Sequence, residues 1–202
     1  MPVAATTKLE SVNIMMAAIG ESPINTLQGV LPVDAQLAVD TLHEQNKTVQ
    51  NEGWSFNTEI DVTLTRDNFK KIALPTDVLR VDANIHQHPS VDPIQRGVQM
   101  YDRLNNTFEF DDDLICTIVY FRSFEEIPEP ARGYITIKAA RVFIDRLVGD
   151  AGLRGYTQQD ETRARAVLLE TDLANADHNI LRGDPSLTNV FSTYSPANAL
   201  IR

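Results

Sequence analysis

The sequence predicts an α+β protein: a helical bundle built from N- and C-terminal helices, a small central antiparallel β-sheet subdomain, and an extended C-terminal arm. Apolar residues recur at a helical period before about residue 54 and again after Pro128, whereas between Ile60 and Phe121 they favour a period of two. The last residues carry almost no charge and follow neither period. We therefore expect helical parts at 1–58 and 125–183, a β subdomain at 59–124, and the arm at 184–202.

The first two helices are predicted by their end signals. Thr7-Lys8-Leu9-Glu10 is a capping box, in which the first and last side chains each bond the other residue's backbone N–H. Gly20 supplies a left-handed stop for this helix. The second helix is expected to take Asp34 as its N-cap and to run to Gly53.

The central region has the pattern of short strands. Ile60, Val62 and Leu64 alternate with polar residues, as in a half-buried strand. Asn105-Asn106 is typical of a hairpin turn, and the stretch from 83 to 97 is expected to be a surface loop. Further strands are expected at 78–81, 99–101, 108–110 and 115–121, the last being the strongest because it is nearly all apolar or β-branched.

Two helices follow Pro128. The apolar residues of the first cover more than one face, which predicts the central helix of a packed group, ending at Gly149. After a linker at 150–156, the box-like Thr157-Gln158-Gln159-Asp160 is expected to start a last helix that ends near Arg182. The buried stripe of that helix should consist of Ala164, Val167, Leu168, Thr171, Ala174 and Leu181.

Charge and composition exclude several classes of function. The chain has 28 acidic and 18 Lys or Arg residues, so its formal net charge is −10. This balance argues against binding nucleic acid by neutralising phosphates, and against docking on anionic lipid. A single Cys excludes a disulfide framework and a Cys-based zinc site. We expect neither a run of apolar residues long enough to span a membrane nor a secretory signal.

The candidate metal ligands have a simpler interpretation. His86 and His88 could bind a metal with Asp82 or Asp92, but two His in a Pro-flanked loop are more often surface residues. Residues 111–113 are three aspartates without the alternating ligands of a calcium loop, so a solvated turn is favoured. Residues 101–130 hold eight acids and two bases, which predicts an acidic surface.

Nothing in the sequence requires catalysis. Cys116 lies in the strongest predicted strand and should be a buried, inert thiol. No Gly-x-Ser-x-Gly turn presents a nucleophile, and the glycine-rich stretch 149–155 lacks the Lys of a phosphate loop. A carboxylate pair spaced for glycan hydrolysis could occur by chance among so many acids. The sequence therefore predicts no catalytic, cofactor-binding or metal-binding residue and no cofactor.

The arm carries the candidate partner-binding residues. An uncharged segment with apolar side chains suits an arm that packs on another subunit, although a terminus without a partner is an equally consistent interpretation. Trp54 and Phe56 are second candidates, with the alternative, which we favour, that they fasten the helix pair to the sheet. The predicted apolar anchors of the arm are Phe191, Tyr194, Leu200 and Ile201.

Three strings resemble one protein family. Residues 17–27, Ala-Ala-Ile-Gly-Glu-Ser-Pro-Ile-Asn-Thr-Leu, are similar to the opening of the tail tubular protein A family of short-tailed bacteriophages. Gly53-Trp54-Ser55-Phe56-Asn57 resembles that family's segment after its second long helix. Residues 125–129 and 137–143 resemble a third signature, and the order of the strings covers nearly the whole chain.

The resemblance implies a structural role in the virion tail. Such proteins form a ring of twelve beneath the portal protein and join it to the tail nozzle, tail tubular protein B. They help to hold the tail fibres and act as gatekeepers of a channel through which genomic DNA passes without specific binding. Assembly would take place in the host cytoplasm, and the partners would be copies of this chain, the portal, the nozzle and the fibres.

Two alternatives remain open at this stage. The first is an enzyme, namely a tail-associated glycan hydrolase acting on cell-envelope polysaccharide. The second is another head-completion or connector protein, which would share the ring and the partner but lack the Gly-Trp-Ser-Phe string.

Overall fold

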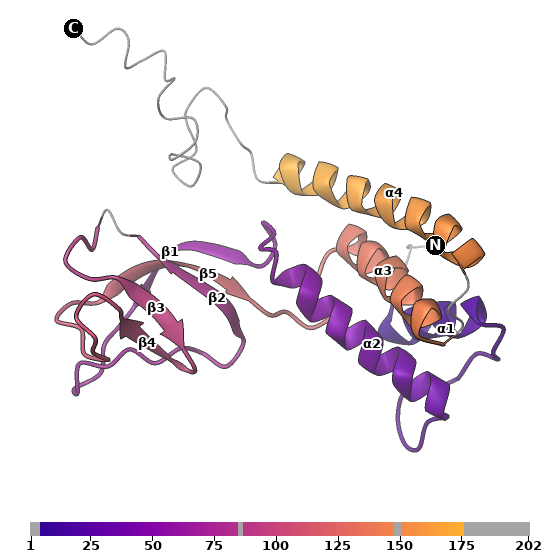
Figure 1. Cartoon of the computed structure of the whole chain (residues 1–202), viewed down its shortest axis with the longest axis horizontal. Helices are drawn as coiled ribbons and strands as arrows, with labels where there is room; N and C mark the ends of the chain where they lie inside the picture. The colour runs from indigo at the N-terminus through magenta and orange to yellow at the C-terminus, as the bar shows by residue number, and fades with distance from the viewer. Residues whose placement is uncertain (1–4, 85–86, 148–150, 176–202) are drawn as a thin grey trace, which may run out of the picture.

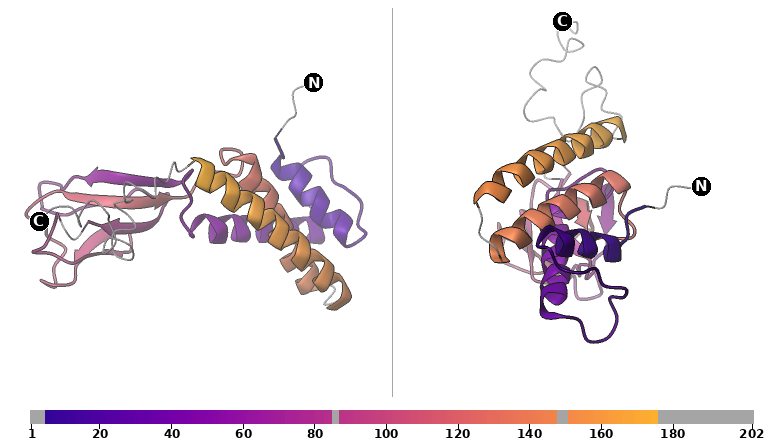
Figure 2. Two further views of the ribbon diagram at one scale, coloured as in Figure 1. Left: turned by 90° about the horizontal axis from the view of Figure 1, so that it is seen from above. Right: turned by 90° about the vertical axis from the view of Figure 1, so that its right-hand side faces the viewer.

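The computed structural model describes residues 5–84, 87–147 and 151–175, and for 151–157 the backbone alone. The described part contains four helices and five strands, which confirms the α+β class. Helices gather at one end of an elongated molecule and strands at the other (Figure 1). The same separation is visible from above (Figure 2).

Helix α1 spans Lys8–Ala18 and begins at the predicted capping box. The Glu10 backbone N–H donates to the Thr7 hydroxyl, and the Thr7 N–H donates to the Glu10 carboxylate at 2.7 Å. Gly20 follows with a φ of +83°, the left-handed conformation expected of the stop. The start of the chain therefore folds as its local sequence predicts.

Helix α2 spans Val33–Gln50, so the predicted N-cap is wrong. The cap position is Pro32, which makes no side-chain hydrogen bond, and Asp34 lies in the first turn. An acidic side chain there is favoured by the positive end of the helix dipole, which explains its place without a capping role. The helix also ends three residues before Gly53, whose φ is +84°.

Helix α3, Glu129–Leu147, is the central helix that its apolar pattern predicts: it contacts α1, α2 and α4. Helix α4 spans Ala151–Asn175 and packs on α3 (Figure 1). The predicted linker at 150–156 is wrong from Ala151 onward, because the helix runs through it, and Thr157 is an interior residue rather than a cap. The predicted ends at Gly149 and Arg182 lie outside the described residues.

The helical core lies where the four helices meet. Its fully buried members include Val12 and Met15 of α1, Leu42 of α2, and Phe143 of α3. From the predicted stripe of α4, only Leu168 is buried; Val167 is 50% exposed and Leu181 lies outside the described residues. α4 is thus the outermost helix, and it reaches the helical core through Leu168 and the partly buried Ala164.

The sheet has the order β1-β5-β2, with all neighbours antiparallel. Strand β5, Leu114–Tyr120, lies in the middle between β1, Thr58–Leu64, and β2, Val78–Ala83. The predicted inward alternation of β1 is wrong at Ile60, which is 61% exposed. Its register with β5 shifts between Glu59 and Val62, and Asp61 adopts a φ of +56°, so this irregularity turns Ile60 outward.

A second, two-stranded sheet lies beside the first. It is a hairpin of β3, Pro93–Arg96, and β4, Gln99–Asp102. The first of these strands occupies residues for which the sequence predicts only loop. The predicted strand at 108–110 is absent: Phe110 instead fills the core of the β part, and Phe108 packs edge-on against Tyr101 at 4.9 Å between ring centroids.

Candidate interaction surfaces

The link between the helical and β parts is built by the Gly-Trp-Ser-Phe-Asn string. Gly53 turns the chain out of α2 with a positive φ, a conformation that favours glycine. A Cβ added there would lie 2.9 Å from Arg80 Nη2 and 3.3 Å from Val119 Cγ2. The glycine therefore serves both a turn and a close approach to the sheet.

Asn57 holds this link together with its side-chain amide. The Trp54 backbone N–H donates to Asn57 Oδ1 at 2.9 Å, and Asn57 Nδ2 donates to the carbonyls of Gln50 at 2.9 Å and Tyr120 at 2.8 Å. Asn57 is 1% exposed, so these bonds satisfy a buried amide fully. One side chain thus connects the end of α2 to the end of β5.

Gln50 makes the second half of the connection. Its Oε1 accepts from the Arg122 backbone N–H at 2.7 Å, and its Nε2 donates to the Arg122 carbonyl at 2.8 Å. The Gln50 amide thus makes the same pair of hydrogen bonds with Arg122 that a neighbouring β-strand would make. Asn57 therefore joins the two parts where the chain enters the β part, and Gln50 joins them where the chain leaves it.

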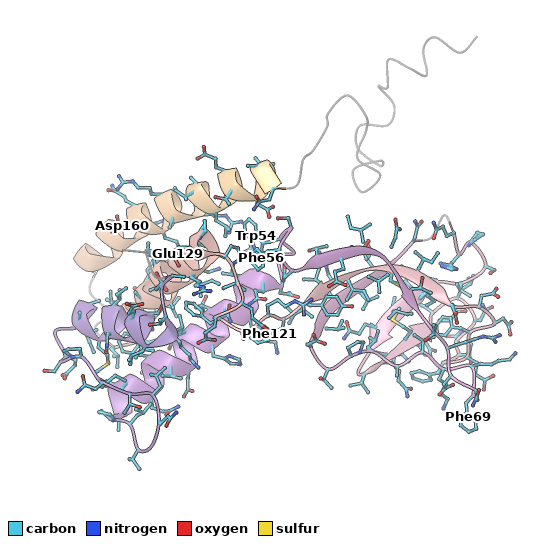
Figure 3. The ribbon with its side chains drawn as sticks, turned by 180° about the vertical axis from the view of Figure 1, so that it is seen from behind. Trp54, Phe56, Phe69, Phe121, Glu129 and Asp160 are labelled. Atoms are coloured by element: carbon cyan, nitrogen blue, oxygen red, sulfur yellow. The ribbon has the colours of Figure 1, made fainter. Side chains whose placement is uncertain are left out.

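Trp54 and Phe56 belong to the helical side of this junction (Figure 3). Trp54 is 4% exposed and its indole N–H donates to the Val49 carbonyl at 2.8 Å; Phe56 packs partly buried against the same core. Trp54 is thus not free to contact another protein. The two aromatic residues therefore have the structural role that we favoured from the sequence. They pack mainly on the helices, however, rather than fastening the helix pair to the sheet.

Polar contacts add to the attachment of α4. Arg165 Nη2 donates to Glu52 Oε2 at 2.8 Å and its Nη1 donates to the Tyr134 hydroxyl at 3.0 Å. Asp172 accepts from the Ser55 backbone N–H at 2.8 Å. These contacts lie next to the Trp54 ring, over which the Arg165 guanidinium stands at 5.8 Å.

The predicted arm anchors, Phe191, Tyr194, Leu200 and Ile201, lie outside the described residues. Among described residues, the large exposed apolar side chains lie at four separate places. Ile14, Val30 and Val33 belong to the α1–α2 end, Leu147 to the end of α3, Val167, Leu169 and Leu173 to α4, and Ile60, Phe69, Val98 and Leu104 to the β part.

The acidic and His-bearing segments have structural roles in part. Asp102 is 1% exposed; burial alone would raise its pKa, but hydrogen bonds from the backbone of Asp92 and Leu104 and from the Asn105 side chain lower it. His88 Nε2 accepts from the Ile115 N–H at 2.9 Å, while His86 lies outside the described residues. The described residues contain no group of three His, Cys, Asp or Glu that could hold a metal ion.

Cys116 is fully buried, as predicted from its strand. Burial, with a smaller effect of the Asp82 charge, raises the pKa of its thiol to about 11. The thiol is therefore protonated and unreactive at neutral pH.

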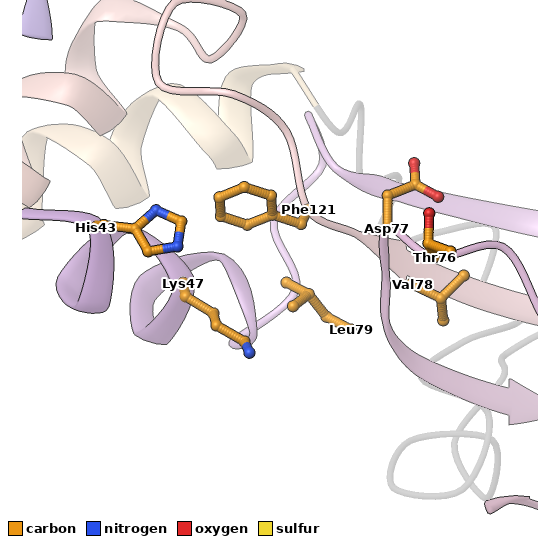
Figure 4. A pocket seen from close by; sticks show the side chains of 7 residues that line it. All are labelled: His43, Lys47, Thr76, Asp77, Val78, Leu79 and Phe121. Carbon is orange, nitrogen blue, oxygen red and sulfur yellow. The ribbon is translucent and has the colours of Figure 1, made fainter. Parts of the chain in front are cut away.

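A pocket of about 270 Å³ lies beside the junction (Figure 4). His43 and Lys47 of α2 form one side, and Phe121 lies between them and the segment 76–79 that enters β2. The His43 and Phe121 rings meet edge to face at 5.6 Å between centroids. Sequence reasoning missed this pocket, because its walls come from segments far apart in the chain.

The described surface of this small α+β protein offers exposed apolar side chains and a pocket as contact sites. A family model described as tail tubular protein matches residues 9–178. Tail tubular protein A of Klebsiella phage KP34 is 30% identical over 171 residues, which is 83% of this chain and 88% of that protein. The chain belongs to the tail tubular protein family and is a structural protein of a phage tail. None of its described helices is long and apolar enough to cross a membrane.

Proposed function

We propose that this chain is the subunit of a ring-forming head-to-tail adaptor. Twelve copies would join the portal protein on the head side to the nozzle protein, tail tubular protein B, on the tail side. The tail fibres would attach with support from the same ring. The observation that carries this proposal is the family match, which spans both the helical and the β part in one continuous stretch.

The distribution of exposed apolar side chains supports a subunit with several neighbours. A ring closed by rotation needs two different surfaces on each copy, and an adaptor needs further surfaces above and below. Apolar side chains emerge at the α1–α2 end, on α4 and on the β part. One small interface on one face would not require this spread.

The net charge supports the passage of DNA. Twelve copies at −10 each would carry a formal charge of about −120, which repels phosphate instead of trapping it. Genomic DNA would therefore move through the channel without specific binding. The chain would act by surface complementarity alone, with no turnover and no cofactor.

The C-terminal arm is proposed as the segment that attaches each copy to a neighbouring subunit. Phe191, Tyr194, Leu200 and Ile201 would serve as its apolar anchors. Cutting the chain after Gly183 should leave the melting temperature nearly unchanged and abolish docking. An unfolded truncated protein would instead place the arm in the core.

The experiment that tests the function is the native mass of the full chain, alone and mixed with the portal ring of the same phage. The expected result is a portal-dependent increase to twelve copies bound per portal ring. A monomer under both conditions would contradict the adaptor role and make assays on envelope glycans the next step.

A further inference from the structure

An aromatic side chain stands exposed at the end of the β part. Phe69 is 78% exposed, although a side chain of this size is normally covered. It lies in the segment 66–71, here called the Phe69 tip, at the end of the molecule opposite the helices (Figure 3). Its position on a projecting turn makes it available to another molecule.

Hydrogen bonds hold this tip in one shape. Asp67 Oδ1 accepts from the backbone N–H groups of Phe69 and Lys71, both at 2.8 Å. The Asp67 N–H donates to the Lys71 carbonyl at 2.7 Å and Lys70 adopts a φ of +61°, which closes the turn. The Phe110 N–H donates to the Lys70 carbonyl at 2.8 Å and fixes the tip to the β core. A contact made by Phe69 would cost little ordering entropy, because its backbone is already fixed.

The junction pocket has the size and chemistry to receive one such side chain. Its volume of about 270 Å³ is below the range typical of sites for drug-sized ligands, about 300–1,000 Å³. Apolar and aromatic groups of Val78, Leu79 and Phe121 line it, with Lys47 and Asp77 among its polar residues. An aromatic ring entering between Phe121 and Leu79 would meet carbon on both sides.

The charges around the two features are complementary. The Phe69 tip carries Lys71, and the acidic turn at 111–113 lies beside it, since Lys70 Nζ pairs with Asp111 at 2.6 Å. The pocket offers one ammonium, Lys47, whereas its carboxylate, Asp77, already pairs with Arg122 at 3.8 Å. A docked tip would therefore place the aspartates toward Lys47.

A single copy does not bring these two features together. Phe69 is at the far end of the β part, and Phe121 is at the junction with the helices (Figure 3). A surface and its complement at different places on one chain produce a head-to-tail contact, which closes into a ring when the rotation allows. The same geometry would leave a free tip and a free pocket on any open chain of copies.

We infer that the Phe69 tip of one copy docks into the junction pocket of the next copy. This inference rests on the proposed ring and specifies a contact within it. The pocket is lined by α2 on one side and by residues 76–79 on the other. A Phe69 side chain docked between them would therefore also hold the helical and β parts at a fixed angle. Neighbouring copies would therefore stiffen each other at the junction.

The first test is Phe69→Ala in the full chain, with Gln28→Ala as the control. Gln28 is an exposed polar residue of the loop between α1 and α2 and is not one of the exposed apolar side chains, and both changes should leave folding intact. Assembly on the portal ring is measured by native mass and sedimentation. Phe69→Ala should weaken association between copies about tenfold or more, as loss of an interface anchor does, whereas Gln28→Ala should assemble as wild type.

The second test detects the contact directly. Asn68→Cys copies, which keep Phe69, are mixed with Thr76→Cys copies, assembled on the portal and treated with a short bis-maleimide. Cys116, the single native cysteine, is buried and should not react. Cross-links should form in the mixture and not with either variant alone, because the contact joins unlike surfaces. Gln28→Cys mixed with Thr76→Cys is the control.

The outcomes separate this inference from the proposed function. Rings that form normally with Phe69→Ala, in a protein whose Asn68→Cys and Thr76→Cys copies give no cross-link, would overturn the inference and leave the adaptor role intact. Loss of assembly in Phe69→Ala with cross-linking of the cysteine pair would support it. A wild-type chain that never assembles, with or without the portal, would overturn both.

Discussion

At the scale of single residues, Gly53 decides how the chain leaves the helices. Two features require glycine at this position: the positive φ of +84°, and the short distance to the sheet, which leaves no room for a Cβ. Other glycines share the first feature, and only the second is specific to Gly53. Gly29 has nearly the same φ, +86°, but an added Cβ would meet nothing within 4 Å. The pair therefore separates backbone strain from steric contact.

We predict that Gly53→Ala destabilises the protein more than Gly29→Ala does. Both should lose about 1 kcal/mol from the positive φ. Gly53→Ala should lose a further ~1 kcal/mol or more, because Val119 Cγ2 must give way and the Arg80 guanidinium must move. Urea denaturation measures both free energies of unfolding. Equal losses of stability in the two variants would mean that Val119 and Arg80 move aside without a measurable loss of free energy.

Asp102 is the residue at which pH should act on the β part. Its pKa is lowered in the folded state, so its contribution to stability is present above the unfolded pKa, about 3.9, and is lost as the pH falls through the folded pKa. We predict that the free energy of unfolding falls below about pH 4, and that Asp102→Asn is less stable at pH 7 with a flatter decline in acid. Denaturation at several pH values tests this.

The control for this prediction is Asp112→Asn, because Asp112 is an exposed member of the same acidic region. It should follow the wild-type pH dependence. If both variants behave alike, the acid sensitivity arises elsewhere, for example at Glu10 or Glu126, whose pKa values are also lowered by backbone hydrogen bonds.

At the scale of elements, the apolar attachment of α4 centres on one buried side chain. Leu168 is the one fully buried side chain among those described for α4, at 1% exposed, and Ala164 packs partly buried against the same core. The polar contacts include the partly exposed ion pair of Arg165 with Glu52, which contributes little. The outermost helix should therefore be the first element to separate.

We predict that Leu168→Ala costs about 2–4 kcal/mol and exposes α4, whereas Leu169→Ala, at a residue 42% exposed, costs about 0.5 kcal/mol or less. Thermal unfolding gives the change in stability, and hydrogen exchange of the α4 amides shows whether the helix opens first. Uniform exchange across α3 and α4 would contradict this order.

The elements also show where local patterns are sufficient. The Thr7 capping box, the strand around Cys116 and the long α3 were each predicted, because near neighbours and periodicity decide them. The helix start predicted at Thr157 is wrong, because a string that resembles a capping box can also lie inside a helix that begins earlier. The strand predicted at Phe108–Phe110 is wrong, because aromatic residues are as common in a hydrophobic core as in a strand.

At the scale of the whole molecule, the excess of negative charge opposes assembly. Each copy carries a formal charge of −10, so neighbouring copies repel one another at long range. Salt screens this repulsion, with a Debye length near 10 Å at about 0.1 M. Short apolar contacts are hardly affected by such concentrations.

We predict that ring formation on the portal is stronger at about 0.3 M salt than at about 0.02 M, because repulsion between copies is screened. Sedimentation at fixed protein concentration measures the bound fraction. Neutral sucrose at matched viscosity is the control for effects other than screening. Assembly that weakens with salt would mean that attraction between opposite charges dominates the interfaces.

The sequence by itself determined the α+β class, the succession of two helices, a β part and two further helices, the buried Cys116 and the family. These depend on local pattern and on short strings of residues that occur in the family's order. Only the tertiary structure decided the surfaces. It placed Trp54 inside the helical core, turned Ile60 outward, left Phe69 exposed, and formed the pocket around Phe121. The reason is physical: exposure is set by which distant segments pack together, and a linear pattern contains no distances between them.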